Sequence, residues 1–274
     1  MKCMKAELAA ILPGRYRTGL SGIPEEEIQE IRLRVGLPVA VVTPEGIRWL
    51  DIAATEEDLR FCVNAASRYS PWNAATVKDG FLTAPGGHRI GLCGEVSGDT
   101  IRNLWSLCIR VAKDFPDLGS DLCPRESTLI IGPPGSGKTT LLRALIRKIS
   151  DSGPLSVSVV DERGEIFPFS NGKLCFHPGK NTDILSGKNK AEGIEAVLRS
   201  MGPGWIAVDE ITAQSDCAAL VRSGWCGVKL LATAHASVSA DLHSRSIYRS
   251  LVSEGLFRSL IVMHPDKSYH RERI

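Results

Sequence analysis

The chain contains 274 residues, of which 43% are hydrophobic and 23% charged, and its formal net charge is +2. These proportions are typical of a globular protein that buries a core. Neither half of the sequence carries the strong basic excess of a protein that follows nucleic-acid phosphates, so the charge balance argues against that class of function.

The eight cysteines form no C-x-x-C pair and no Cys/His cluster with zinc spacing. Several of them, such as Cys93 and Cys108, lie inside apolar runs. This pattern predicts buried free thiols in a reducing compartment. No apolar run approaches the roughly 18–20 residues that cross a bilayer, and we therefore expect a cytoplasmic protein.

Short helical and strand patterns alternate in the first part of the chain. Residues 28–35 fit either a helix or a strand, and residues 38–50 read as a hairpin around a Pro-Glu-Gly turn. Apolar residues at helical spacing predict an amphipathic helix over residues 55–70. We predict a mixed α+β N-terminal domain over residues 1–112, followed by a linker at 113–126 that is rich in proline, glycine and acidic residues.

After the linker, apolar strand candidates alternate with helical patterns. The strand candidates are residues 127–132, 155–162, 204–210, 229–235 and 259–263. The helical patterns are residues 138–150, 191–202 and 215–224. Nearly continuous apolar strands separated by helices predict an α/β domain over residues 127–274, with a mostly parallel sheet covered on both faces.

The sequence GPPGSGKT at residues 132–139 matches the phosphate-binding pattern G-x-x-x-x-G-K-[ST]. A predicted strand runs into this loop and a predicted helix leaves it, so backbone N–H groups and the helix N-terminus would face the phosphates. In such loops the lysine reaches the β- and γ-phosphates and the Ser/Thr hydroxyl binds Mg²⁺. We therefore predict a catalytic role for Lys138, a metal-binding role for Thr139, and ATP binding by Gly132, Pro133, Pro134, Gly135, Ser136, Gly137, Lys138, Thr139 and Thr140.

Two acids, Asp209 and Glu210, follow the apolar strand WIAV at 205–208. A carboxylate in this position holds Mg²⁺ through water in nucleotide sites of this type, so Asp209 is the second predicted metal-side residue. Glu210 is placed to accept a proton from an attacking water, which favours hydrolysis over passive nucleotide binding.

Three further acids, Asp161, Glu162 and Glu165, follow the strand candidate 155–162. Parallel strands bring their carboxyl ends to one edge of the sheet, where ligands bind in open α/β folds. We predict that one of these acids orients the attacking water or the metal shell, and we name Glu162 as a catalytic residue. A solvated acidic loop is the alternative.

His235 ends the next strand candidate. The same topology brings it to the edge of the sheet where the loop at 132–139 and the acids of residues 161–165 and 209–210 are expected, which we call the phosphate edge. We predict that Thr233 or His235 senses the γ-phosphate, with His235 as the catalytic candidate. A hydrogen-bonded or solvated histidine without a ligand is the alternative.

These segments together resemble the secretion ATPases of the type II and type IV systems, and most closely the stage III sporulation protein AA family. The segments that carry the resemblance are EIRLRVGLPV, GFLTAPGGHRIGLCGE, LCIRVAK, GPPGSGKTTLLRAL, VVDERGEI, RSMGPGWIAVDEI and SGWCGVKLLATAHA. The resemblance implies a RecA-like P-loop ATPase core behind the N-terminal domain. It also implies that an acidic box at residues 161–165 and a histidine box around His235 belong to the nucleotide site.

The resemblance implies partners as well. It implies a hexameric ring that drives a sporulation channel complex, working on the cytoplasmic side of a membrane with membrane channel proteins. In ring ATPases a neighbouring subunit's arginine often completes the site, and the candidates here are Arg89, Arg110 and Arg199. The polar segment 178–190 suggests no role.

Three other functions are compatible with the predicted P-loop core. A P-loop ATPase that acts on nucleic acid, a phosphotransferase, and a nucleotide-gated structural ring subunit with little turnover share the predicted core. The charge balance disfavours the first, the lack of an obvious lid disfavours the second, and the presence of both Asp209 and Glu210 disfavours the third.

Overall fold

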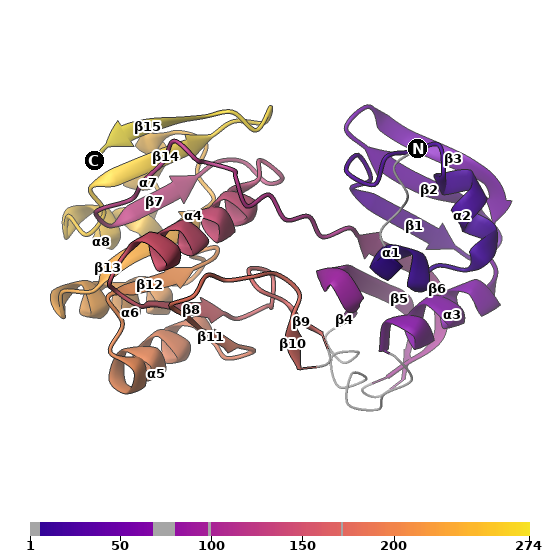
Figure 1. Ribbon diagram of the computed structural model, residues 1–274, viewed down its shortest axis with the longest axis horizontal. Coiled ribbons are helices and arrows are strands. Elements are labelled where there is room, and N and C mark those ends of the chain that lie inside the picture. Colours follow the sequence, from indigo (N-terminus) through magenta and orange to yellow (C-terminus); the bar gives the residue numbers. More distant parts are fainter. Residues whose placement is uncertain (1–5, 68–79, 98–99, 171) are drawn as a thin grey trace. The chain divides into compact units, whose positions relative to one another are not determined.

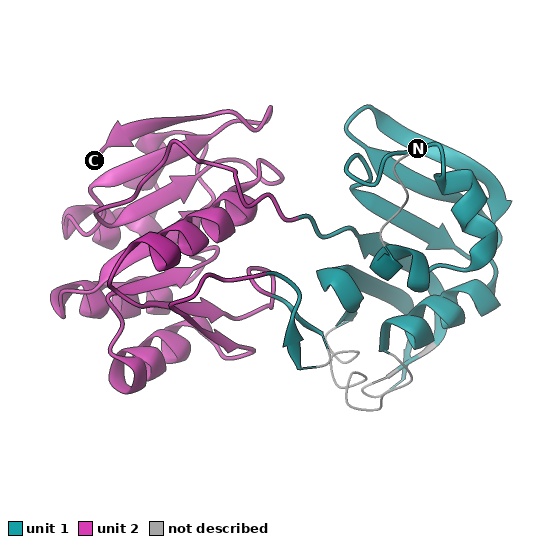
Figure 2. Cartoon of the chain, in the orientation of Figure 1, with its two compact units in different colours: residues 1–113, 168–176 teal, residues 114–167, 177–274 magenta. Residues whose placement is uncertain are grey.

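The computed structural model describes residues 6–67, 80–97, 100–170 and 172–274. Its contacts divide the chain into two compact units, shown in Figure 2. Unit 1 comprises residues 1–113 and 168–176, and unit 2 comprises residues 114–167 and 177–274.

This division differs in two ways from the predicted domains. Residues 114–126, which the composition marks as a linker, are grouped with unit 2, and the segment 168–176 is grouped with unit 1. The second difference has a visible cause in the packing of Gly87, a residue of unit 1. A Cβ atom built on Gly87 would lie 2.8 Å from Pro168 and 3.3 Å from both Cys175 and Phe176.

Unit 1 is built on a six-stranded antiparallel sheet with the strand order β3-β2-β1-β6-β5-β4 (Figure 1). The strands are β1 (Glu30–Arg34), β2 (Pro38–Thr43), β3 (Gly46–Ala53), β4 (Phe81–Thr83), β5 (Arg89–Ser97) and β6 (Thr100–Arg110). The helices are α1 (Ala6–Ala10), α2 (Gly14–Leu20), α3 (Glu56–Ser67) and the 3₁₀ turn η2 (Pro85–Gly87). A small separate hairpin consists of β9 (Phe169–Ser170) and β10 (Lys173–Leu174).

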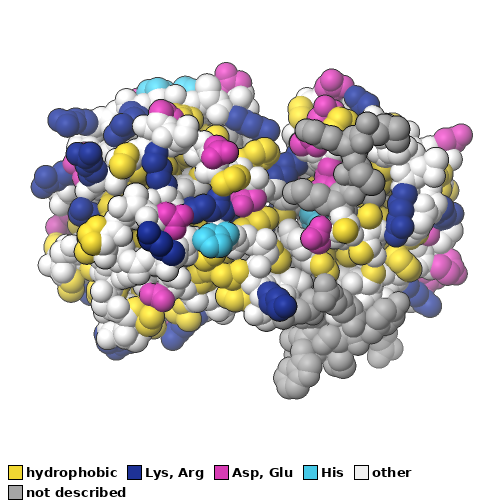
Figure 3. Space-filling view, in the orientation of Figure 1, with side chains coloured by type: hydrophobic (Ala, Val, Ile, Leu, Met, Phe, Trp, Pro, Cys, Tyr) yellow, Lys and Arg dark blue, Asp and Glu magenta, His cyan; other side chains and the backbone are white. Residues whose placement is uncertain are grey.

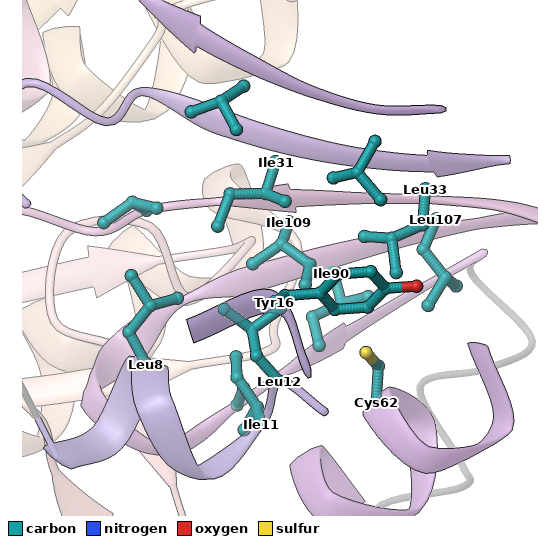
Figure 4. Packing of buried hydrophobic residues seen from close by; sticks show 14 of the residues in the cluster. Leu8, Ile11, Leu12, Tyr16, Ile31, Leu33, Cys62, Ile90, Leu107 and Ile109 are labelled. Carbon is teal, nitrogen blue, oxygen red and sulfur yellow. The ribbon is translucent and has the colours of Figure 1, made fainter. Parts of the chain in front are cut away.

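The core of unit 1 lies between this sheet and its helices. Alternate residues of the strands, such as Ile31, Leu33 and Ile109, point to one face and pack with Tyr16 of α2 and Cys62 of α3 (Figure 4). The ambiguous segment 28–35 therefore contains a strand, because alternation supplies one apolar row to the core. The predicted hairpin is β2–β3, and the predicted helix at 55–70 is α3, although residues 68–70 lie outside the described residues.

The prediction that the thiols are buried is wrong for several cysteines. Cys62 and Cys217 are buried, Cys108 is half-buried, and Cys93 is exposed. Cys93 follows the buried Leu92 in β5, and successive side chains of a strand point to opposite faces. The apolar run therefore places Leu92 in the core and Cys93 on the other face of the sheet.

Unit 2 is built on a seven-stranded sheet with the order β11-β8-β12-β13-β7-β14-β15. All neighbouring strands are parallel except β15, which runs antiparallel to β14. In chain order the elements are β7 (Thr128–Ile131), α4 (Lys138–Ser152), β8 (Val157–Asp161), β11 (Thr182–Ser186), α5 (Lys190–Met201), β12 (Trp205–Val208), α6 (Gln214–Trp225), β13 (Lys229–Ala234), α7 (Ser239–Ser244), α8 (Ser246–Ser253), β14 (Ser259–Met263) and β15 (Tyr269–Arg273).

Helices cover both faces of this sheet. Leu129 and Ile131 of β7 share one buried cluster with residues of α5, α6 and α8. Ile130, between them in the strand, points to the opposite face, where α4 packs with Leu141 and Leu145 buried. The carboxyl ends of β7, β8, β12 and β13 therefore meet at one edge, which positions the candidate site. Within the described residues, no helix combines the length and apolar character that crossing a membrane requires.

Candidate functional site

The loop between β7 and α4 has the geometry of a phosphate cradle. Gly137 has φ 96° and immediately precedes α4, which begins at Lys138 with no acidic residue in its first turn. Gly132 must lack a side chain, because a Cβ atom there would lie 2.7 Å from both the carbonyl oxygen of Met263 and Oγ of Ser136. With no acidic residue in the first turn of α4, the partial positive charge of the helix N-terminus favours an anion at this loop.

Ser136 supplies a second sign that this loop accepts a polar ligand. Its side chain is buried, and its Oγ atom is among the buried polar atoms of the described residues that have no hydrogen-bond partner. Buried hydroxyl groups are normally hydrogen-bonded, so an unpaired one in a glycine-rich loop indicates a missing partner. A phosphate oxygen bound in the loop would be such a partner.

Asp209 lies beside the loop at the carboxyl end of β12. Its Oδ2 accepts a hydrogen bond of 2.7 Å from Oγ1 of Thr139, and its Oδ1 accepts one from Oγ1 of Thr233. The two predicted metal-side residues, Thr139 and Asp209, are therefore brought together. Their hard oxygen atoms suit Mg²⁺, which proteins bind through one or two carboxylates together with substrate phosphates.

The predicted base, Glu210, follows Asp209 and lines the same pocket. Its φ is 50°, in the left-handed region that side-chain-bearing residues seldom adopt. Its Oε1 lies 2.9 Å from Nε2 of His235, and its Oε2 lies 3.2 Å from Nη1 of Arg163. Both carboxylate oxygens of Glu210 are thus held at the same edge of the sheet.

His235 connects the phosphate loop to Glu210. Nζ of Lys138 donates hydrogen bonds to the carbonyl oxygens of Gly132 (2.8 Å) and Pro133 (2.9 Å), and it lies 3.3 Å from Nδ1 of His235. An ammonium group can only donate, so Nδ1 of His235 accepts, and Nε2 carries the proton that is donated to Glu210. Burial lowers the pKa of Lys138, an effect opposed by the negative charges of Asp209 and Glu210.

The acidic segment that follows β8 divides into two parts. The carboxylate of Asp161 accepts hydrogen bonds from the backbone N–H groups of Glu165 (2.9 Å), Ile166 (3.0 Å) and Phe167 (2.8 Å). These bonds stabilise the turn at residues 161–167. Burial raises the pKa of Asp161 to about 6, against the lowering effect of these N–H groups. Glu162 instead lies at the pocket that Glu210 also lines, with its Oε2 3.5 Å from Nζ of Lys190.

The three candidate arginines each have a local contact. Arg89 lies over the ring of Phe81, Arg110 is 3.5 Å from Glu30, and Arg199 donates to the carbonyl oxygen of Glu195. Arg89 and Arg110 belong to unit 1 and Arg199 to unit 2. None of these contacts involves the residues of the phosphate edge.

Two further residues, Arg163 and Lys190, lie at this edge, and neither is a predicted site residue. The basic patch Lys188–Lys190 reads as solvated surface in the sequence; this is correct for Lys188 but wrong for Lys190, which is buried. Arg163 lies within the acidic segment 161–165, whose pattern predicts roles for the carboxylates and none for the arginine. Lys190 follows Asn189, whose side chain accepts from the N–H of Glu192 and so caps α5. That capping pattern was readable in the sequence and places Lys190 at the first position of a helix.

Comparison with known proteins adds a family and a fold. A family model described as sporulation stage III, protein AA, matches residues 3–272. Stage III sporulation protein AA of Bacillus subtilis (strain 168) is 35% identical over 271 residues, covering 92% of this chain and 88% of that protein.

Solved structures similar to this chain include an ATPase and a pilus retraction motor. The Legionella pneumophila ATPase DotB has a TM-score of 0.55 and 17% identity, covering 90% of this chain and 76% of its own. The pilus retraction motor PilT, solved with bound ADP, has a TM-score of 0.61 and 18% identity, covering 86% of this chain and 74% of its own. These similarities confirm the predicted RecA-like fold, and the family match extends over nearly the whole sequence. The chain belongs to the sporulation stage III, protein AA family.

Proposed function

We propose that the chain binds ATP with Mg²⁺ and hydrolyses it, as the motor subunit of a membrane-associated sporulation complex. The observation that carries this proposal is the convergence of Lys138, Thr139, Asp209, Glu210 and His235 at one sheet edge, linked by the contacts described above. Each residue type there has a matching task in phosphoryl transfer to water.

The residues divide this work between them. Lys138 turns from the loop carbonyls to the β- and γ-phosphates, and the loop N–H groups bind the remaining phosphate oxygens. Thr139 and Asp209 would hold Mg²⁺, which would supply positive charge beside the phosphates. Glu210 accepts the proton of the attacking water, directly or with Glu162 orienting that water.

His235 couples phosphate binding by Lys138 to proton transfer by Glu210. When Lys138 turns to the phosphates, Nδ1 of His235 loses its donor, while Nε2 keeps its contact with Glu210. The hydrogen bonding of the imidazole that contacts Glu210 thereby depends on whether the γ-phosphate is present. Thr233 supports the same link, since its hydroxyl contacts both Asp209 and the N–H of Glu210.

His235→Ala is expected to reduce kcat by about 10–100-fold, while the Kd for ATP stays within about threefold. The reason is that His235 contacts Glu210 but reaches the phosphates only through Lys138. Steady-state turnover and equilibrium binding of a labelled ATP analogue measure the two effects. His243→Ala, on an exposed face of α7, is the matched control, and an equal loss of binding and turnover would make His235 a structural residue.

Phosphate release from ATP by the purified chain, with no acceptor added, tests the proposed reaction. Release is expected with Mg²⁺ and expected to stop when EDTA removes the metal. Asp209→Asn should raise the Mg²⁺ concentration that gives half-maximal rate by at least about tenfold, because it removes a charged metal-side group. Release only with an added acceptor would identify a phosphotransferase instead.

The same assay separates the remaining alternatives. The net charge is only +2, and basic and acidic side chains are interspersed on the face shown in Figure 3. We therefore expect DNA or RNA to leave the rate unchanged, and a steep rise would support action on nucleic acid. A negligible rate at saturating ATP would support a nucleotide-gated structural subunit.

The ring, the partners and the location are part of the proposal. By analogy with the secretion ATPases that share the fold, we propose a hexamer, completed in trans by Arg89, Arg110 or Arg199, that works through membrane channel proteins at the cytoplasmic face of a membrane. Mass measurement of the chain with and without a non-hydrolysable ATP analogue tests the ring. A monomer under both conditions would contradict it.

A further inference from the structure

Lys190 is a buried cation at the edge of the candidate site. It begins α5, its side chain is 6% exposed, and it lines the same pocket as Glu162, Asp209 and Glu210. Long cationic side chains are almost never fully buried unless they are paired. The partners of Lys190 should therefore reveal what the buried charge does.

Three groups from three separate segments surround its ammonium group. Nζ of Lys190 donates a 2.7 Å hydrogen bond to the carbonyl oxygen of Glu210. It also lies 3.5 Å from Oε2 of Glu162 and 3.8 Å from Oδ2 of Asp216. Asp216 in turn accepts from the N–H groups of Thr212 and Ala213 at the start of α6. The shortest contact of Lys190 is thus with the main chain of the proposed base.

That contact fixes an unusual backbone conformation. The N–H group of Glu210 donates to Oγ1 of Thr233 at 2.7 Å, and its carbonyl group accepts from Lys190. Both peptide groups of Glu210 are therefore held, on either side of a left-handed φ of 50°. A non-glycine residue keeps such a conformation only where its surroundings enforce it, and these conformations cluster at functional sites.

The direction of the Glu210 side chain depends on this conformation. In a continued strand the residue after Asp209 would point to the opposite face of the sheet. The left-handed turn instead directs the carboxylate to His235 and Arg163 at the phosphate edge. A change in the Glu210 backbone would move the carboxylate without altering Asp209 or the phosphate loop.

We propose that Lys190 is a positioning residue for the base Glu210, with Glu162 and Asp216 as the counter-ions that allow its charge to be buried. This inference rests on the proposed function. It gives the acidic segment a second task, since Glu162 holds the lysine whose ammonium group sets the direction of Glu210. It also gives a role to the end of the segment 178–190.

A double-mutant cycle between Lys190 and Glu210 tests the proposal. Lys190→Met keeps the length of the side chain and removes the donor. It is expected to reduce single-turnover ATP hydrolysis by at least about tenfold, with the Kd for an ATP analogue within about twofold. In a Glu210→Gln background the same change should alter the rate by less than about twofold, because the residue through which Lys190 acts is already disabled. Lys188→Met, at an exposed position two residues earlier, is the control in both backgrounds.

Each outcome decides a separate point. An equal loss of rate in both backgrounds, or no loss in either, overturns the positioning role of Lys190. If Glu210→Gln alone hydrolyses ATP at the normal rate, the base assignment under the proposed function fails, and the positioning role fails with it. Should Lys190→Met not fold, Lys190→Arg keeps the buried positive charge between Glu162 and Asp216 while displacing the donor from Glu210, and the same cycle applies to it.

Discussion

Glu210→Gln is expected to leave ATP bound and to slow its hydrolysis by about 10²–10⁴-fold. The amide has nearly the size of the carboxylate and can still accept a hydrogen bond from Nε2 of His235, but it cannot take a proton from water. Thr139 and Asp209, which bind each other at 2.7 Å, remain as they are, so the Mg²⁺ side of the site is unchanged. The variant should therefore separate binding from chemistry.

Single-turnover release of labelled phosphate measures the rate of the chemical step, and equilibrium binding of ATP measures the affinity. Glu195→Gln is a suitable control, because Glu195 lies on α5 in a surface ion pair with Arg222. Normal turnover in Glu210→Gln would move the base to Glu162 or Glu165. Loss of ATP binding would indicate that Glu210 supports the fold of the loop.

Much of the fold of unit 2 could be predicted because its strands are apolar along their whole length. β7, β8, β12 and β14 are buried at every position, and such runs between helices identify a parallel sheet. The sequence does not predict β11, because this strand lacks a continuous apolar run. Its sequence TDILS is only partly buried at the sheet edge, so the segment reads as a polar loop.

The candidate site was predictable to the extent that topology alone brings residues together. Parallel strands carry Asp161, Asp209 and His235 to one edge, and the spacing of the glycines predicts a phosphate-binding loop at 132–139. What each side chain does at that edge depends on contacts that spacing does not encode. Asp161 is committed to three backbone N–H groups, whereas the next residue, Glu162, faces a lysine from α5.

The membership of residues 168–176 was not predictable from the sequence. Nothing in their composition separates them from the flanking segments, yet Pro168, Cys175 and Phe176 surround Gly87 of unit 1. Because the turn held by Asp161 ends at Phe167, the candidate site is followed in the chain by a segment of the other unit. The grouping reflects contacts made in the folded chain, such as the packing around Gly87, and the composition does not show them.

Lys138→Ala is expected to weaken ATP binding by about 10–100-fold, the effect of losing one or two charge-assisted hydrogen bonds, and to reduce turnover at least as much. Lys138 is 7% exposed, and burial lowers its pKa. Burying this charge beneath the loop therefore reduces the free energy of unfolding. Removing the charge should therefore change the free energy of unfolding little, although the loop carbonyl oxygens of Gly132 and Pro133 lose their donor.

Chemical denaturation and ATP binding, measured on the same preparations, distinguish these effects. Lys148→Ala, near the other end of α4, is the matched control and should bind ATP as the unaltered chain does. If Lys138→Ala bound and hydrolysed ATP normally, the loop at 132–139 would not be a phosphate cradle. A large loss of stability with binding in proportion to the folded fraction would make Lys138 a structural residue. The expected result is the reverse, because the amine of Lys138 contacts two loop carbonyl oxygens and lies 3.3 Å from His235, and it can exchange these neutral partners for phosphate oxygens.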